Sequence, residues 1–215
     1  VWDLATGIIA KKFDGFKGPG MYVCDVKFSR DGRYFLASSL KEIYVFDTRT
    51  WRAIRKFPVT RWCVSANFSP DGKNLLTGDG DGLFHLWDLA TSKKLWTIQG
   101  HKSGVFGMGD ATAIAFSPDG KSVLTSSGCD GTVRLWDAAG GKLLQEFTGF
   151  KTATKAVSGV NGLALSPDGT LLATGSYDHK ILLWDVATGA LRRELEGHNE
   201  AVFDLAFRPD GSNRT

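Results

Sequence analysis

The 215-residue sequence is poor in cysteine and methionine and has no long apolar run. Its cysteines, Cys24, Cys63 and Cys129, form no C-x-x-C pair, so neither a zinc site nor a redox motif is predicted. No stretch approaches the roughly 20 apolar residues of a membrane span, and no signal-peptide pattern opens the chain. The formal net charge of +3 argues against a surface for polyanions. We expect reduced thiols, a cytoplasmic setting, and neither a membrane nor a nucleic-acid partner.

What the sequence does contain is a recurring four-residue turn. In Ser166-Pro167-Asp168-Gly169, Ser at the first position, Pro at the second and Gly at the fourth are the preferences of a type I turn. Proline presets φ near about −65°, and glycine relieves the exit from the turn. Related segments occur at 29–32, 69–72, 117–120 and 208–211. Short apolar runs flank these turns, which favours an all-β fold.

A second motif, an aromatic residue followed by Asp, recurs with the turn. Successive copies lie 41 to 49 residues apart. They are Trp2-Asp3, Phe46-Asp47, Trp87-Asp88, Trp136-Asp137 and Trp184-Asp185. A period in the forties with four short strands per repeat is typical of a propeller blade. One blade cannot bury both faces of its sheet, so neighbouring blades must stack around an axis.

Together these motifs resemble the WD-repeat β-propeller family over essentially the whole chain. Gly100-His101 and Gly197-His198 match the Gly-His that opens a repeat. The resemblance implies an all-β propeller of four-stranded antiparallel blades, with strands a to d running outward from the axis. We predict one propeller segment, in which residues 1–13 end one blade, 14–57, 58–99, 100–148 and 149–196 form blades one to four, and 197–215 start a further blade.

The ring is expected to be incomplete, and the native N-terminus to lie upstream of Val1. A d strand at 7–13 and an a strand at 201–207 are the expected parts of a fifth blade. An arc that does not close exposes apolar sheet faces. Self-association through these edges is therefore predicted.

The family resemblance also implies a hydrogen-bonded set within each blade: His before strand a, Ser or Thr at the end of b, Asp in the b–c turn and Trp in c. Such a set satisfies both nitrogens of a buried imidazole. Blade three offers His101, Asp130 and Trp136, with Gly128 where the hydroxyl belongs. Under this alignment no blade has the full set, and we assign its members structural roles. The others are Ser176, Asp178 and Trp184 in blade four, where Phe150 replaces His, Asp81 and Trp87 in blade two, and His198.

No catalytic residue, metal ligand or cofactor is predicted. Ser127, His101 and Asp130 could form a Ser-His-Asp cluster, but no G-x-S-x-G elbow accompanies them. His85 is expected to be a packed strand residue. The run 78–82 lacks the lysine of a P-loop and the glutamate spacing of an EF-hand, and it fits a Gly-Asp turn.

The resemblance implies a non-catalytic scaffold that binds peptides or partner domains. One alternative is a regulatory module of a larger enzyme, such as a kinase or protease. Another is an enzyme acting at the central channel. The a strands disfavour this second alternative, because they carry Val26, Ala66, Ile114, Leu163 and Leu205 at matching positions.

In the family, the d–a and b–c loops share one face. That places Tyr22, Arg61, Trp62 and Tyr177 at or near a binding surface. Aromatic and arginine side chains are enriched in binding hot spots. The lengthened connections 103–110 and 151–158 would rim this face, and its positive edge, formed by Lys151 and Lys155, would suit an acidic or phosphorylated peptide.

Overall fold

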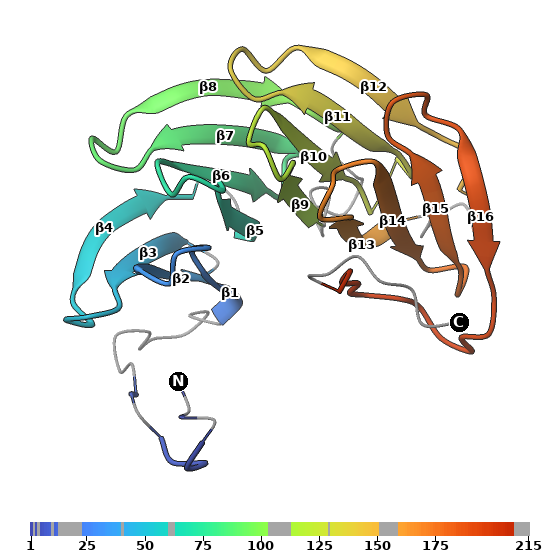
Figure 1. Cartoon of the computed structure of the whole chain (residues 1–215). Helices are drawn as coiled ribbons and strands as arrows, with labels where there is room; N and C mark the ends of the chain where they lie inside the picture. The colour runs from blue at the N-terminus through green and yellow to red at the C-terminus, as the bar shows by residue number, and fades with distance from the viewer. Residues whose placement is uncertain are drawn as a thin grey trace.

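The computed structural model describes residues 1, 3, 5–9, 11–12, 23–39, 41–59, 63–102, 113–128, 130–150 and 159–208. These residues form β1 to β16, arranged as four separate four-stranded sheets, and every strand pairing is antiparallel (Figure 1). The prediction of an all-β propeller segment of four-stranded blades is confirmed. Within the described residues no helix is long and apolar enough to cross a membrane.

Each sheet is one blade, and its strands follow chain order. Blade one is β1 (Val23–Phe28), β2 (Tyr34–Ser39), β3 (Glu42–Asp47) and β4 (Ala53–Pro58). Blade two is β5 (Cys63–Phe68), β6 (Asn74–Asp79), β7 (Leu83–Asp88) and β8 (Lys94–Gln99). Blade three is β9 (Ala113–Phe116), β10 (Ser122–Ser126), β11 (Val133–Asp137) and β12 (Leu143–Phe147). Blade four is β13 (Val160–Leu165), β14 (Leu171–Ser176), β15 (Ile181–Asp185) and β16 (Leu191–Leu195).

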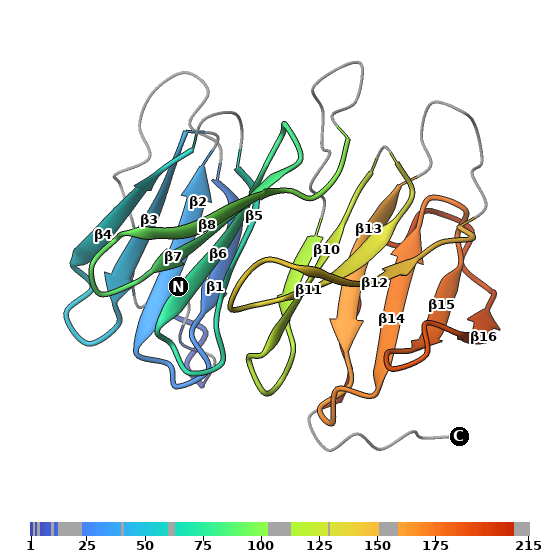
Figure 2. The same ribbon diagram turned by 90° about the horizontal axis from the view of Figure 1, so that it is seen from above.

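The four blades fan out in an arc that does not close (Figure 1). The first strands β1, β5, β9 and β13 lie on the inner side of the arc and contact one another in sequence. The last strands β4, β8, β12 and β16 lie on the outer side. The turns that join first and second strands lie along one side of the arc, at the lower edge in Figure 2. Because the strands are antiparallel, the turns between second and third strands lie on the opposite side.

The four-residue turn has the same geometry in all four blades. In blade three the amide of Gly120 donates to the Ser117 carbonyl at 2.9 Å, and Gly120 has a φ of 72° that favours glycine. The Ser117 hydroxyl donates to Asp119 Oδ1 at 2.6 Å and accepts the Ser122 amide at 2.9 Å. These contacts span at most five residues, so the local sequence alone dictates the turn.

These turns make the stability of the protein depend on pH. The Ser hydroxyls, aided by backbone amides, hold the pKa values of Asp31, Asp71, Asp119 and Asp168 below their usual range. The pKa of an unfolded Asp is about 3.9. A depressed folded-state pKa therefore stabilises the fold above that pH, and this stabilisation is lost as the pH falls through the folded-state value. We expect the urea midpoint, followed by circular dichroism, to fall between pH 7 and pH 3, and the fall to shrink in Ser117→Ala. A midpoint that stays constant over this range would contradict the assignment.

Most of the apolar core lies between neighbouring blades, and a smaller cluster lies within blade one. Trp87 packs with Leu36, Ile43 and Val45 of blade one. Trp136 of blade three packs in the same way with Phe84 of blade two, and Trp184 of blade four with Phe147 of blade three. Each tryptophan on a third strand is therefore buried against the preceding blade, which fixes how the blades stack.

The expected parts of a fifth blade are not strands among the described residues. Residues 201–208 carry no strand, although the Val202 amide donates to the Ser176 carbonyl at 3.2 Å, as the Val160 amide does to Ser127 at 3.1 Å. This segment thus occupies the place of a first strand, but none of the described residues forms a second strand that pairs with it. In the described part of 7–13 only a single bridge forms, at Ile9.

Candidate interaction site and the polar cluster of blade three

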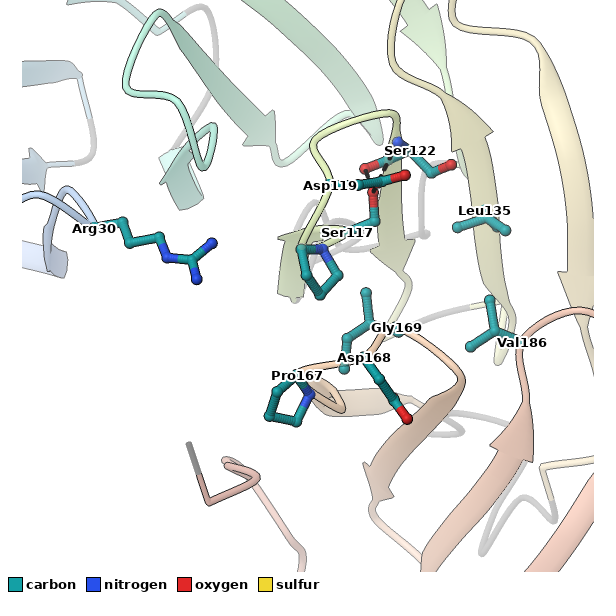
Figure 3. A pocket seen from close by; sticks show the side chains of 11 residues that line it. Arg30, Ser117, Asp119, Ser122, Leu135, Pro167, Asp168, Gly169 and Val186 are labelled. Atoms are coloured by element: carbon teal, nitrogen blue, oxygen red, sulfur yellow. Dashed lines mark hydrogen bonds between the residues drawn. The ribbon is translucent and has the colours of Figure 1, made fainter. Parts of the chain in front are cut away.

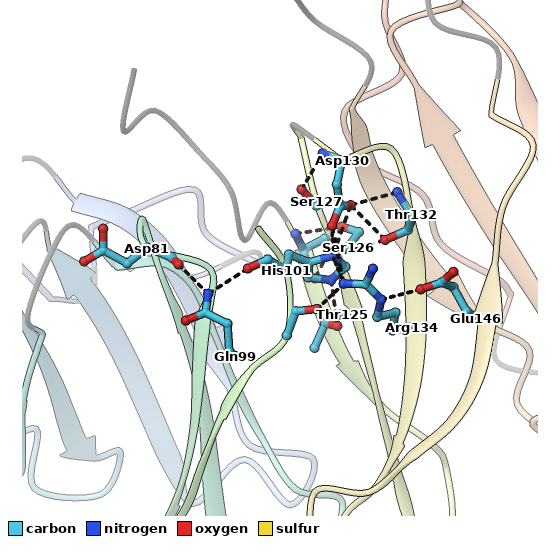
Figure 4. Close-up of polar contacts among 12 residues, drawn as sticks. Asp81, Gln99, His101, Thr125, Ser126, Ser127, Asp130, Thr132, Arg134 and Glu146 are labelled. Atoms are coloured by element: carbon cyan, nitrogen blue, oxygen red, sulfur yellow. Dashed lines mark hydrogen bonds and ion pairs between the residues drawn. The ribbon is translucent and has the colours of Figure 1, made fainter. Parts of the chain in front are cut away.

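A buried polar cluster joins His101, which follows β8 in the chain, to β10, to β11 and to the turn between these two strands of blade three (Figure 4). The His101 side chain is 1% exposed. Its Nε2 lies 2.9 Å from Thr125 Oγ1, and its Nδ1 lies 3.0 Å from Asp130 Oδ2. The indole Nε1 of Trp136 donates to the same Thr125 hydroxyl at 2.9 Å. These contacts form a series of hydrogen bonds: Trp136 donates to Thr125, Thr125 donates to His101, and His101 donates to Asp130. The series satisfies the indole nitrogen, the hydroxyl and both imidazole nitrogens.

This geometry corrects the prediction made for blade three. The sequence alignment placed the hydroxyl at 128, occupied by Gly128, and concluded that no blade has a complete set. The hydroxyl comes instead from Thr125, in the middle of β10, so blade three has all four members. The reason is strand register. Trp136 is paired with Val123, and its indole reaches the residue two positions further along β10, which is Thr125 rather than a residue after the strand end.

A recurring threonine was the available signal in the sequence. Trp87 donates to Thr77 at 3.1 Å, and Trp184 donates to Thr174 at 3.0 Å. Each threonine precedes its tryptophan by 10 or 11 residues, so the pair repeats with the blade.

Blade one has lost both members of this pair. Its third strand carries Phe46 opposite Phe35, and Ala37 stands where the other blades have threonine. Phenylalanine has no donor and alanine no acceptor, so the double replacement leaves no buried polar group without a partner. The aromatic residue is therefore tolerated as a purely apolar part of the blade.

Asp130 is the electrostatic centre of the cluster. Burial alone would raise the pKa of this carboxyl, but hydrogen bonds from His101 and Thr132 and the nearby Arg134 hold it well below its usual range. Arg134 Nη1 lies 3.3 Å from Asp130 Oδ2, while its Nε bonds Glu146 at 2.6 Å. The carboxylate is thus ionised and already paired, as a structural ion pair requires.

Blades two and four use other arrangements. In blade four, Phe150 is buried with its ring centre 5.2 Å from that of Trp184, so an apolar contact replaces the histidine. The Ser176 hydroxyl bonds Asp178 instead. In blade two, Asp79 is the buried acid: its Oδ1 accepts the amides of Asp81 and Leu83.

His85 is a buried strand residue in blade two. Its Nδ1 lies 2.9 Å from Thr97 Oγ1 and its Nε2 lies 3.6 Å from Asp79 Oδ2. Within the described part of the chain, no group of three or more His, Cys, Asp or Glu side chains is arranged to hold a metal ion. His198, in contrast to His101, is exposed.

The cluster of blade three is built for packing rather than for chemistry. The Thr125 hydroxyl, which contacts Nε2 of the imidazole, belongs to a residue that is 0% exposed, and the Thr132 hydroxyl lies 3.2 Å from Nδ1. Ser127 uses its own hydroxyl to accept the Asp130 amide at 3.0 Å. Among the described residues, the hydroxyls that contact the His101 imidazole are thus those of two threonines, and each of them also bonds another member of the cluster.

Of the predicted binding residues, the structure describes Tyr177. It is half-buried in the turn between β14 and β15, and its ring meets that of Phe203 edge-on, with centres 5.8 Å apart. Phe203 is 64% exposed. The other five, Tyr22, Arg61, Trp62, Lys151 and Lys155, lie outside the described residues, as do the connections 103–110 and 151–158.

Four-stranded blades stacked around an axis, with Trp-Asp endings and Thr–Trp hydrogen bonds, define a WD-repeat propeller segment. The chain belongs to the family described as WD domain, G-beta repeat, which matches residues 10–47, 52–88, 92–137, 141–185 and 189–213. The second match contains the last strand of blade one, β4, and the first three strands of blade two. Each sequence repeat therefore joins two neighbouring blades covalently.

The chain is similar to several curated relatives that are longer than it. Periodic tryptophan protein 2 homolog of Dictyostelium discoideum is 34% identical over 178 residues, or 81% of this chain and 18% of that protein. Serine-threonine kinase receptor-associated protein of the same organism is 26% identical, over 61% of this chain and 41% of that protein. Eukaryotic translation initiation factor 3 subunit I of Bombyx mori is 29% identical, over 60% and 41%. This chain thus spans less than half of each relative.

Proposed function

We propose that the chain is a non-catalytic scaffold that binds other proteins or peptides through loops at the faces of its blades. One observation carries the proposal: in blade three, the polar residues of the family's hydrogen-bonded set bond one another inside the blade. These residues are His101, Thr125, Asp130 and Trp136. Buried and mutually satisfied side chains hold a rigid framework, and loops on rigid frameworks are the usual place for recognition.

The loop face that carries Tyr177 is the proposed recognition surface. An exposed aromatic, Phe203, stands beside Tyr177 there. Tyrosine and arginine are enriched at binding hot spots, and the family resemblance predicts Arg61, Trp62 and Lys151 at the same face. An acidic or phosphorylated peptide is the ligand that these side chains favour.

The relatives support a second candidate, in which the chain is a regulatory module of a larger protein. It covers 18% of the periodic tryptophan protein 2 homolog and 41% of the kinase receptor-associated protein. The segment would then supply binding, and any chemistry would belong to other parts of the protein.

Quantitative pull-down with the 215-residue chain tests the scaffold proposal. We expect the triple variant Arg61→Ala, Trp62→Ala and Tyr177→Ala to lose the proteins that the parent captures. Leu95→Ala is the matched control, because Leu95 is an exposed apolar side chain on the outer strand β8. Light scattering of the same samples reports self-association through the open ends of the arc. A folded triple variant that recovers the same proteins would place the binding surface elsewhere.

A further inference from the structure

A groove of about 530 Å³ opens between the first turns of blades three and four (Figure 3). This volume is within the range of about 300–1,000 Å³ typical of ligand sites. Its apolar lining comes from Leu135, Leu165, Val186 and two turn prolines, Pro118 and Pro167. The groove lies on the side of the arc opposite the Tyr177 turn, so it is separate from the loop face.

The two turns that form the walls of the groove are each held by their own hydrogen bonds, and they lie close to one another. A Cβ at Gly169 would lie 3.4 Å from Pro118 Cδ, which is ordinary van der Waals contact. The same spacing recurs one blade earlier, where a Cβ added at Gly120 would lie 3.5 Å from Pro70 Cδ. A preformed groove of this kind needs little ordering when a ligand binds.

Two carboxylates line the groove, those of Asp119 and Asp168, and each uses only one of its oxygens in its own turn. Asp119 Oδ1 accepts the Ser117 hydroxyl and the Lys121 amide, and Asp168 Oδ1 accepts Ser166 and Thr170. The Oδ2 atoms of Asp119 and Asp168 make no hydrogen bond or ion pair with the described residues. Both carboxyls have a lowered pKa, first because of the Ser hydroxyls, so both are ionised at neutral pH.

Arg30 of blade one is the one cationic side chain among the described residues that line the groove. Arg30 occupies the turn position that holds proline in blades two to four, and it also lines the groove. Figure 3 shows its guanidinium extended toward the turn of Asp119. Arg30 is exposed and makes no hydrogen bond or ion pair with the described part of the chain.

We propose that this groove binds a dipolar peptide segment, with a basic side chain beside Asp119 and Asp168 and an acidic side chain toward Arg30. An apolar side chain between the two charges would cover Pro167, which lies on the Arg30 side of the two carboxylates in Figure 3. Arg30 and the two carboxylates place opposite charges on two sides of the groove, and this charge pattern fixes the direction of the bound segment. The site adds a second recognition surface to the loop face, and it holds or fails independently of Tyr177.

Fluorescence anisotropy with a defined probe tests the proposal. The probe is fluorescein-labelled acetyl-Gly-Arg-Leu-Glu-Gly, titrated with the whole 215-residue chain. Replacing its arginine by citrulline should weaken binding about tenfold, as expected for loss of a charge-assisted hydrogen bond. The double variant Asp119→Asn and Asp168→Asn should weaken binding of the arginine peptide equally, yet leave the citrulline peptide unchanged. Asparagine keeps the Oδ1 acceptor that each turn needs, removes the charge and replaces Oδ2 by an amide nitrogen.

A second set of variants tests the contact between the glutamate of the peptide and Arg30. Arg30→Gln should weaken binding of the probe and have no effect on a peptide with glutamine in place of glutamate. Asp88→Asn and Arg49→Gln change the same charges on turns away from the groove and should leave the affinity unchanged. Absence of binding, or an equal loss in the Asp88→Asn control, overturns the proposal. A dimeric parent that becomes monomeric in the double variant would show that a second copy fills the groove, and this also overturns it.

Discussion

Trp184→Ala is expected to lower the free energy of unfolding by about 3–5 kcal/mol, the range for deleting a large buried aromatic. Trp184 is 4% exposed and lies between blades three and four. Its ring meets those of Phe147 and Phe150 at 5.8 and 5.2 Å between centres. Alanine would leave a cavity among side chains held by two different sheets, and neither sheet can collapse into it without moving its blade.

Urea unfolding followed by circular dichroism measures this loss. Trp136→Ala should behave alike, because Trp136 fills the same place between blades two and three. Phe46→Ala is the matched control and should cost less, because its buried cluster consists of Phe35 and Ala37 of its own blade. Equal midpoints for Trp184→Ala and the parent would show that the blades are not packed as described.

The second large effect is expected from Thr125→Val, which changes almost no volume. Thr125 Oγ1 serves both His101 Nε2 and Trp136 Nε1, each at 2.9 Å. Valine leaves two buried polar groups without partners, and each such group costs about 1–3 kcal/mol. The free energy of unfolding should therefore fall by about 2–6 kcal/mol, although the apolar packing is preserved.

Thr174→Val is the internal comparison for this substitution. Thr174 accepts the indole of Trp184 at 3.0 Å, but Phe150 stands where the histidine would be. Only one side-chain donor loses its partner there, so Thr174→Val should cost less than Thr125→Val under the same conditions. Equal costs for the two variants would disprove the shared role of Thr125.

Much of the fold follows from contacts within a few residues. The turn 117–120 is specified by a hydroxyl, a carboxylate and a glycine that meet one another locally. The Trp-Asp ending is similar: Asp185 Oδ1 accepts the Thr188 amide at 2.8 Å, three residues away. Because such motifs are local and repeat with the blade, the sequence predicts the strands, their order and the propeller class.

Contacts between residues far apart in the sequence could not be predicted in this way. The repeat pattern predicts the roles of His101, Asp130 and Trp136, but it assigns the hydroxyl to position 128 instead of Thr125. Strand register decides which side chain the indole reaches, and the repeat pattern does not contain that register. It predicted a strand at 201–207, yet a strand exists only where another pairs with it. The groove of Asp119, Asp168 and Arg30 brings together turns from three blades. Local sequence thus determined each blade, and only the stacking of blades decided which side chains meet.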